Sequence, residues 1–391
     1  MTTLGGGLAA AGAGACALAL AMGIGRFAYT PMLPPMLEES GLTLSAAGLI
    51  ASANFLGYLV GALLATRAAF ARHRVRWLRV GLALSVVTTA AMALDLGAPG
   101  WGAVRLVSGV ASAFVLVFTS AIVFELAARA GRPMLASLLY AGVGAGIAMS
   151  ALLVFAGREA GWSAALLWWA LAGLATLLAL APWRSLDRPP GPPVPPRADP
   201  GRAGADRRAL DRLVWSYGCL GFGYVITATF LVVMVRSMPD AALLEAWTWA
   251  VVGLAGAPSN WLWAKVAART GPYAAIVAAF VLEAVGVALA AAGQSAAAVL
   301  VGAALLGGTF MAITALGLAT ARELAPDRPD QTIARMTFAF SVGQIVGPAV
   351  GGWLAERSGS FAAPSWMAAA VLLLGAALAA AAARDGRQRA S

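Results

Sequence analysis

The sequence predicts an all-α polytopic membrane protein with twelve transmembrane helices in two pseudo-symmetric six-helix bundles. Of its 391 residues, 61% are hydrophobic and 11% charged, whereas soluble domains average roughly 45–50% and 25%. The apolar residues run in blocks of about 20, the length at which a helix crosses ~30 Å of hydrocarbon. A charged, proline-rich stretch near the middle divides the chain into halves of similar length. A water-soluble globule is excluded, because one core could not bury so much apolar surface.

The apolar blocks give the expected elements in order. In the first half, spans are predicted at 8–36, 46–66, 77–96, 101–125, 133–157 and 162–183. In the second half, they are predicted at 210–235, 246–264, 273–292, 296–321, 333–355 and 364–383. The first block lacks a positively charged leader and a clear cleavage pattern, so it is interpreted as a span and not as a signal peptide.

The central stretch is predicted to be a linker. It combines a run of prolines with arginines and aspartates, which favours extended, solvated chain over a packed helix. The expected domains are therefore residues 1–183, a linker at 184–209, and residues 210–391. Gly23-Ile-Gly-Arg26 in the first span matches Gly221-Phe-Gly-Tyr224 in the seventh, which supports an internal duplication of the kind several transporters use.

The basic residues predict the orientation of the chain in the membrane. If both termini face the cytoplasm, 22 of the 27 Lys and Arg residues fall on that side, and the opposite side has only Arg158, Arg236 and Arg357. Cytoplasmic loops of membrane proteins carry such an excess. These arginines are scattered over short loops without aromatic stacking platforms, so nucleic-acid binding is disfavoured as the source of the +10 net charge.

Several function classes are excluded or disfavoured by what the sequence lacks. Lys265 is followed by Val266, so no P-loop for ATP is present. The single histidine, His73, lies in an arginine-rich loop, and Cys16 and Cys219 lie in apolar segments. No metal site or cofactor is therefore implied. A membrane-embedded enzyme is disfavoured, because no acids, histidines or nucleophile cluster at one interface.

Three charged residues fall clearly inside predicted spans, where each costs roughly 2.5–3.5 kcal/mol on insertion scales. Arg26 follows two glycines and precedes Pro31, which removes a backbone hydrogen bond and can bend the span. Arg26 is a candidate to bind an anionic group of a substrate, because it is permanently charged. The alternative is a packing clamp that pairs with helix carbonyls or a polar neighbour.

The other two buried charges also allow two interpretations. Glu283 lies near the middle of the ninth span and is a candidate for proton coupling, or it hydrogen-bonds between helices. Arg105, a turn inside the fourth span, faces a cavity or extends its head toward the interface. Among uncharged residues, Asn54, Tyr58, Asn260 and Gln344 are possible ligand contacts or interhelical bridges. Pro258, Gly347 and Pro348 are gating candidates.

Several motifs carry a resemblance to a known family. The two six-span halves, Arg105-xxx-Gly109 and Gly343-xxx-Gly-Pro-xx-Gly-Gly352 resemble the major facilitator superfamily. Gly25-Arg-Phe-Ala-Tyr-Thr-Pro31, Ala51 to Tyr58 and Gly307 to Thr314 resemble the YbfB/YjiJ branch of bacterial inner-membrane facilitators. The usual aspartate is missing from the loop after the second span, and the fifth span lacks the Gly-Pro of antiporters, so the direction of transport is left open.

The resemblance implies alternating access around a central cavity. It places seven residues on helices that can face this cavity, as substrate-binding candidates: Arg26, Tyr29, Asn54, Tyr58, Arg105, Tyr224 and Gln344. The ninth span is usually peripheral in this fold, which weakens the assignment of Glu283.

The predicted function is a secondary transporter of the bacterial inner membrane, not an enzyme, that moves a small organic solute. The solute is expected to be anionic, and its transport is expected to be coupled to protons. The protein is expected to need no cofactor and to be a monomer in the bilayer. The alternative is an efflux antiporter for drugs or metabolites without anion preference. A channel and an enzyme are the less favoured classes.

Overall fold

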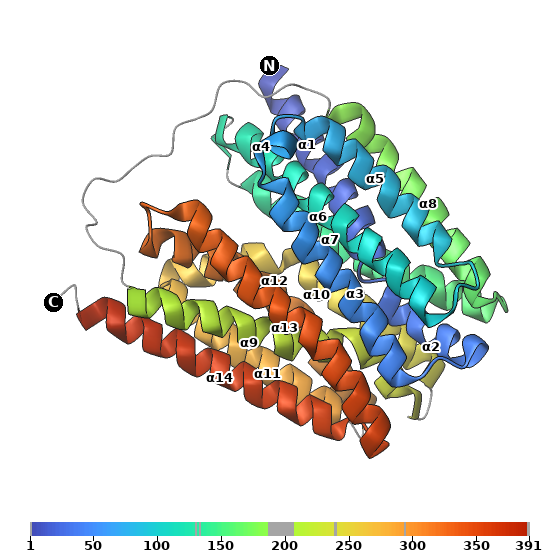
Figure 1. Ribbon diagram of the computed structural model, residues 1–391. Helices are drawn as coiled ribbons and strands as arrows, with labels where there is room; N and C mark the ends of the chain where they lie inside the picture. The colour runs from blue at the N-terminus through green and yellow to red at the C-terminus, as the bar shows by residue number, and fades with distance from the viewer. Residues whose placement is uncertain are drawn as a thin grey trace.

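The computed structural model describes residues 2–129, 131–132, 134–186, 207–237, 241–292 and 295–388, which fold into helices joined by short turns (Figure 1). The helices are α1 (Thr2–Leu18), η1 (Ala19–Ile24), α2 (Tyr29–Ser40), α3 (Leu44–Ala65), α4 (Ala68–Ala71), α5 (Arg74–Ala91), α6 (Gly97–Arg129), α7 (Met134–Glu159), α8 (Ala164–Ser185), α9 (Arg207–Met234), η2 (Val235–Ser237), α10 (Ala241–Thr270), α11 (Pro272–Ala292), α12 (Ala296–Leu324), α13 (Pro329–Ser358) and α14 (Ala362–Gln388). The all-α class predicted from the sequence is confirmed.

Ten helical segments of the described chain are long and apolar enough to cross a membrane. Each overlaps a predicted span. The predicted spans at 77–96 and 246–264 correspond to α5 and α10, which are not among the ten. Arginines are frequent in the first turns of α5, whereas tryptophans, Pro258 and Asn260 lower the hydropathy of α10. The expected number of twelve spans therefore stays a prediction.

The predicted linker falls mostly outside the described residues. Helix α8 continues through Ser185 and α9 begins at Arg207, so both ends of the predicted 184–209 segment are helical. The prolines of the linker lie within residues 187–206, outside the described chain. We call the end of the bundle where α8 ends and α9 begins the linker end, and the end where α2 ends and α3 begins the far end (Figure 1).

Two groups of helices lie against each other, and we call α1–α8 the first set and α9–α14 the second set. Within the sets, α3 packs on α6, α5 on α8, α9 on α13 and α14, and α11 on α12 and α14. Between the sets, α3 packs on α13, α7 on α10, and α2 on α9. In Figure 1 the first set occupies the upper right and the second set the lower left, so these three contacts form the seam between them.

Glycines allow the helix backbones to touch along this seam. A Cβ on Gly253 of α10 would lie 2.5 Å from the carbonyl oxygen of Gly144 on α7, and a Cβ on Gly48 of α3 would overlap the carbonyl oxygen of Pro348 on α13. Any larger side chain would push these helices apart. Small residues are the usual means by which membrane helices approach closely.

The first apolar block is not one continuous helix. Residues Ala19–Ile24 form a π-helical turn, with the amide of Phe27 donating to the carbonyl of Met22. Gly25 and Ala28 keep right-handed helical backbone angles, but the regular ladder of i→i−4 hydrogen bonds is interrupted between them, before α2 begins at Tyr29. The sequence-based expectation of a bend at Pro31 is corrected here. Pro31 lies in the first turn of α2, where its missing amide hydrogen costs little. The interruption lies at Gly25–Ala28, which includes Arg26.

Candidate functional site

A cavity of ≈ 170 Å³ lies between the two helix sets. Its walls come from the first span, α3, α6 and α7 on one side and from α9, α10, α12 and α13 on the other. The lining residues are mostly apolar and aromatic: Met22, Arg26, Phe27, Tyr58, Leu116, Tyr140, Val143, Tyr217, Tyr224, Asn260, Phe310, Met311, Thr314, Ala315, Leu318, Thr337, Phe340 and Gln344. Tyr140 and Thr337 lie near the linker ends of their helices, so the cavity extends from Arg26 toward that end.

Arg26 is the charged residue in this lining, and it is 4% exposed. Its Nη2 donates a 2.8 Å hydrogen bond to Oε1 of Gln344 on α13. The amide of Gln344 in turn donates to the hydroxyl of Tyr224 on α9. A chain of polar contacts therefore runs from the first helix set into the second at the wall of the cavity.

Aromatic rings surround the guanidinium of Arg26. Its Cζ lies 4.3 Å from the ring centroid of Tyr58 and 4.6 Å from that of Phe55, both on α3, and 5.6 Å from that of Phe27. Such contacts stabilise a desolvated cation through the ring quadrupoles. No carboxylate of the described residues forms an ion pair with Arg26, and its Nε has no hydrogen-bond partner among them. The positive charge is therefore shielded but not neutralised by the described part of the protein.

Arg105 holds the turn at Gly25–Ala28 of the first span in place. Its Nη1 donates to the carbonyl of Gly25 at 2.6 Å, and its Nη2 donates to the carbonyl of Arg26 at 2.8 Å. The hydroxyl of Ser108 donates to the same Gly25 carbonyl, and the amide of Asn54 donates to the carbonyl of Arg105. Backbone carbonyls without a helical hydrogen-bond partner inside a membrane need such donors, and Arg105 supplies them to the carbonyls of Gly25 and Arg26 at the interruption.

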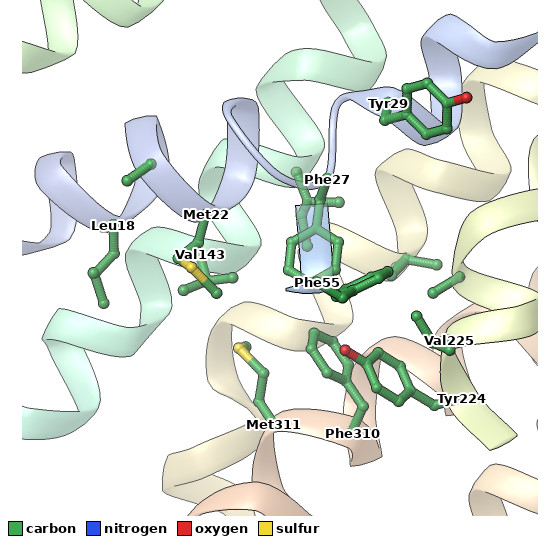
Figure 2. Packing of buried hydrophobic residues seen from close by; sticks show 14 of the residues in the cluster. Leu18, Met22, Phe27, Tyr29, Phe55, Val143, Tyr224, Val225, Phe310 and Met311 are labelled. Carbon is green, nitrogen blue, oxygen red and sulfur yellow. The ribbon is translucent and has the colours of Figure 1, made fainter. Parts of the chain in front are cut away.

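Three aromatic rings of the second helix set lie in parallel along the cavity. Tyr224 stacks against Phe310 at a centroid distance of 5.4 Å and against Phe340 at 5.9 Å, with 8° between the planes in both pairs. Phe27, in the turn at Gly25–Ala28, meets Phe310 edge to face at 6.0 Å. Figure 2 shows Phe27, Phe310 and Tyr224 converging, with Met22 and Met311 beside them. The walls are thus flat and apolar around a single buried cation.

Glu283 lies away from this cavity. It is fully buried on α11, which packs against α12 and α14, and the hydroxyl of Thr309 on α12 is the polar group that faces it. It is not in the lining of the 170 Å³ cavity.

Polar contacts join the two sets at the far end. Glu38 of α2 pairs with Arg236 at 2.7 Å, and Arg158 of α7 pairs with Glu245 of α10 at 3.4 Å. Two further pairs, Arg158 with Glu38 and Arg236 with Glu245, close the four residues into a ring. We call these four residues the far-end ring. It ties the first set to the second at the end opposite the cavity.

Two hydrogen bonds add to the contacts at the far end. The hydroxyl of Thr30 donates to the carbonyl of Ala228 at 2.5 Å, and the amide of Ser45 donates to Glu356 at 2.8 Å. Between Arg26 and this end lies a cavity of only ≈ 10 Å³, lined in part by Tyr29 and Arg105. The site is therefore closed on the far side.

The sequence-predicted residues fall into two groups. Arg26, Tyr58, Tyr224 and Gln344 line the cavity together, whereas Tyr29, Asn54 and Arg105 contact the backbone behind it. The gating candidates lie outside the lining: Pro258 and Pro348 remain inside continuous helices, and a Cβ on Gly347 would meet Val225 at 2.6 Å.

The sequence interpretation missed most of the aromatic lining. Tyr140, Tyr217, Phe310 and Phe340 lie in spans that are apolar along their length. One signal was present: four of the six tyrosines of the chain line the cavity, namely Tyr58, Tyr140, Tyr217 and Tyr224. A tyrosine in the middle of a span carries a hydroxyl that needs a polar partner, so the tyrosines were a signal for part of this lining.

The fold defines the class of protein. Two solved structures share it: the nucleoside transporter NupG, with a TM-score of 0.72, 16% identity and coverage of 95% of this chain and 98% of that one, and a mutant of the same transporter, with a TM-score of 0.73, 14% identity and coverage of 96% and 99%. No curated protein matches the sequence. At this identity the likeness shows a transporter fold alone.

The sequence itself gives the family. Residues 18–380 match the family described as "Uncharacterised MFS-type transporter YbfB". The chain belongs to this family, and it is a multi-pass membrane protein of the MFS transporter class. The resemblance drawn from the motifs at Gly25–Pro31, Ala51–Tyr58 and Gly307–Thr314 is confirmed.

Proposed function

We propose that this protein is a secondary active transporter that moves a small organic anion across the bacterial inner membrane by alternating access. Its chain forms twelve spans in two pseudo-symmetric halves, residues 1–183 and 210–391, joined by a linker at 184–209. One observation carries the proposal: the uncompensated cation of Arg26 lies at the wall of a cavity between the two helix sets.

Alternating access needs a site that opens to one side at a time. The far-end ring and the close approach of Gly48 on α3 to Pro348 on α13 hold the sets together on one side of Arg26, and the ≈ 170 Å³ cavity lies on the other. The linker end carries most of the basic residues, so we assign it to the cytoplasm together with both termini. In this proposal, the cavity extends toward the cytoplasmic side and the far end is the closed gate.

The anion preference follows from electrostatics in a low-dielectric site. A guanidinium cut off from water binds a carboxylate or another anion through charge-assisted hydrogen bonds, which are about twice as strong as neutral ones. Arg26 retains an unpartnered Nε, and its bond to the neutral Gln344 can be exchanged for one to an anion. Tyr58, Tyr224 and Gln344 are the further substrate-binding residues of the proposal.

Glu283 is our candidate for proton coupling. Three charged side chains of the described residues are buried, and Glu283 is the acid among them. An ionised carboxylate inside a helix bundle is costly, so a buried acid without a basic partner is suited to exchange a proton when the surrounding helices move. Because α11 packs on α12, whose Phe310 and Met311 line the cavity, Glu283 would sense substrate through helix displacement.

The test is transport by the purified protein in liposomes. A library of carboxylates and neutral metabolites is first screened by thermal stabilisation, since any selective ligand stabilises the folded state. The best radiolabelled binder should then move against its gradient when a pH gradient is imposed. Glu283→Gln should keep binding but lose the response to pH, and the exposed Glu323→Gln serves as its matched control. Flux that is unchanged after collapse of the pH gradient would refute coupling.

The second candidate is an efflux antiporter that takes neutral metabolites or drugs. The apolar lining supports it, because Met22, Met311 and the aromatic residues offer adaptable apolar contacts. Nucleosides, the substrates named for the structural neighbour NupG, are neutral probes of this kind. Equal stabilisation by uridine in the wild type and in Arg26→Gln would favour this candidate over the anion transporter.

A further inference from the structure

We propose that the substrate is a planar, single-ring aromatic anion of the benzoate class, with its carboxylate on Arg26 and its ring among the aromatic side chains of α9, α12 and α13. This inference rests on the proposed function and names the substrate class of the same cavity. It combines three features of the site: volume, ring geometry and the placement of the charge.

The volume fits one ring. The cavity measures ≈ 170 Å³, close to the ~150 Å³ of an engineered apolar cavity that binds benzene. A six-membered ring with one carboxylate therefore fits. A two-ring compound, or a base with an attached sugar, exceeds this space unless the helices separate further.

The walls favour a flat ring over a saturated one. The planes of Phe310, Tyr224 and Phe340 are within 8° of each other in successive pairs, so they present aligned aromatic surfaces along the cavity. Phe27 meets Phe310 edge to face from the first set. A planar ring can continue this pattern by offset stacking or by an edge contact, each of which contributes beyond simple apolar burial. A chair-shaped ring of the same size cannot.

The charge is placed at the edge of this aromatic surface. Gln344 bonds to Arg26 through its carbonyl and to Tyr224 through its amide, so one side chain spans the gap between the cation and the central ring of the stack. A carboxylate that replaces the Gln344 carbonyl at Arg26 therefore brings its attached ring against Tyr224 and its neighbours. The Tyr224 hydroxyl, released from Gln344, becomes a second donor to the anion.

The experiment compares three probes of matched size on the purified, full-length protein. Benzoate has both the ring and the charge, cyclohexanecarboxylate keeps the charge without the planar ring, and benzamide keeps the ring without the charge. Dissociation constants are measured by titration calorimetry in detergent or nanodiscs. We expect benzoate to bind most tightly, cyclohexanecarboxylate roughly three- to tenfold more weakly, and benzamide roughly tenfold or more weakly.

Two variants should remove these two preferences separately. Arg26→Gln should equalise benzoate and benzamide, whereas Phe310→Leu should equalise benzoate and cyclohexanecarboxylate while keeping the preference for the anion. Phe338→Leu is the matched control, because Phe338 is 56% exposed on the outer surface of α13. Each variant is first checked for wild-type elution on gel filtration. Phe310→Tyr keeps the aromatic ring, so this variant should retain the preference for benzoate over cyclohexanecarboxylate, and it provides a folded comparison if Phe310→Leu misfolds.

The outcomes separate this inference from the proposed function. If benzoate binds no better than cyclohexanecarboxylate while another carboxylate is transported, the aromatic assignment is wrong and the anion transporter stands. If benzoate binds as expected but no gradient moves it across a liposome membrane, the site is aromatic and the transport proposal fails. Preferential binding of uridine over benzoate would overturn the inference in favour of a neutral nucleoside.

Discussion

Arg26 and Gln344 are joined by a hydrogen bond of 2.8 Å although 318 residues separate them in the chain. This contact links the interrupted first span to α13, and Gln344 extends it to Tyr224 on α9. A neutral amide accepts one hydrogen bond from a buried guanidinium, but a carboxylate forms stronger hydrogen bonds with it and can therefore displace the amide. We expect substrate to compete with Gln344 for Arg26, so that binding and contact between the helix sets are coupled at one side chain.

Replacing Gln344 by Leu tests this link. The change removes both hydrogen bonds and leaves Arg26 and Tyr224 without this buried partner, which should lower the free energy of unfolding by about 1–3 kcal/mol. The melting temperature of the purified protein, followed by intrinsic fluorescence, reports the loss. Gln331→Leu, at an exposed position of the same helix, is the control. Equal melting temperatures for the two variants would show that the bridge does not stabilise the fold.

Comparing alanine variants of Ser108 and Ser112 distinguishes the support of the interrupted first span from the effect of losing a buried hydroxyl within one helix. Both are buried on α6, but Ser108 donates to the Gly25 carbonyl whereas Ser112 donates to Gly109 of its own helix. Ser108→Ala should cost about 1 kcal/mol of stability and Ser112→Ala less. Both values are read from melting temperatures, and an equal loss in the two variants would contradict a special role for Ser108.

Arg105→Lys tests whether the hydrogen bonds from Arg105 to the Gly25 and Arg26 carbonyls also position the Arg26 side chain for binding. Lysine holds two carbonyls less firmly than the two-pronged guanidinium, so the change should lower both the melting temperature and the affinity for benzoate. Titration calorimetry on the purified variant measures the affinity. An affinity unaffected by Arg105→Lys would argue against positioning of Arg26 through its backbone.

Removing the two acids of the far-end ring, which leaves Arg158 and Arg236 without these partners, should shift the protein toward a state open at the far end. Single exposed ion pairs contribute little, about 0–1 kcal/mol, so we specify the double change Glu38→Gln with Glu245→Gln, which removes both acids of the ring. A cysteine introduced at Ala228 reports the shift, because its carbonyl accepts from Thr30 beneath the ring. Its alkylation by a membrane-impermeant maleimide added at the far end should become several-fold faster.

Two controls define this labelling experiment. The native Cys16 and Cys219 are replaced by serine so that one thiol is read. Asp211→Asn breaks the pair between Asp211 and Arg335, which joins two helices of the second set, and should leave the labelling rate unchanged. Equal acceleration by Asp211→Asn would attribute the effect to general loosening of the fold.

Replacing glycine by alanine should lower the stability of the protein at Gly253 and raise it at Gly173. Gly253→Ala places a Cβ 2.5 Å from the backbone of Gly144 and Ala148, and such overpacking costs about 1–3 kcal/mol. In Gly173→Ala, the new Cβ meets no atom of the described residues within 4 Å, and the change should stabilise α8 by up to about 1 kcal/mol through helix propensity. Melting temperatures that move in the same direction would contradict the close approach of α7 and α10.

The positions of the helices and the buried charges could be predicted from sequence, because hydrocarbon imposes rules on single residues. Apolar blocks located the helices to within a few residues, and the cost of charge inside a span singled out Arg26, Arg105 and Glu283, all of which are buried. The same rules do not say what a buried charge faces. Arg105 holds backbone carbonyls and Glu283 lies behind the cavity, and both placements depend on helix rotation, which a hydropathy pattern does not encode.

The first span itself could be predicted from its apolar residues, but the place where it is interrupted was harder to predict. Pro31 marked the place where a bend was expected, but the break depends on acceptors satisfied from another helix, as Arg105 and Ser108 show. The aromatic lining was hidden for a related reason. Phe310 and Phe340 are apolar residues in apolar spans, and only the packing of α9, α12 and α13 shows that they stack on Tyr224.

The break at Gly25–Ala28 lets the first span attach to both helix sets. The segment before it touches α7, where a Cβ on Gly23 would lie 2.5 Å from the backbone of Gly146, whereas the segment after it is fastened to α9 through Thr30 and Ala228. If the two sets rotate apart in the proposed transport cycle, a rigid, uninterrupted helix would have to lose one of these attachments. In that proposal, the interruption lets the two segments of the span move relative to each other, with Arg26 between them.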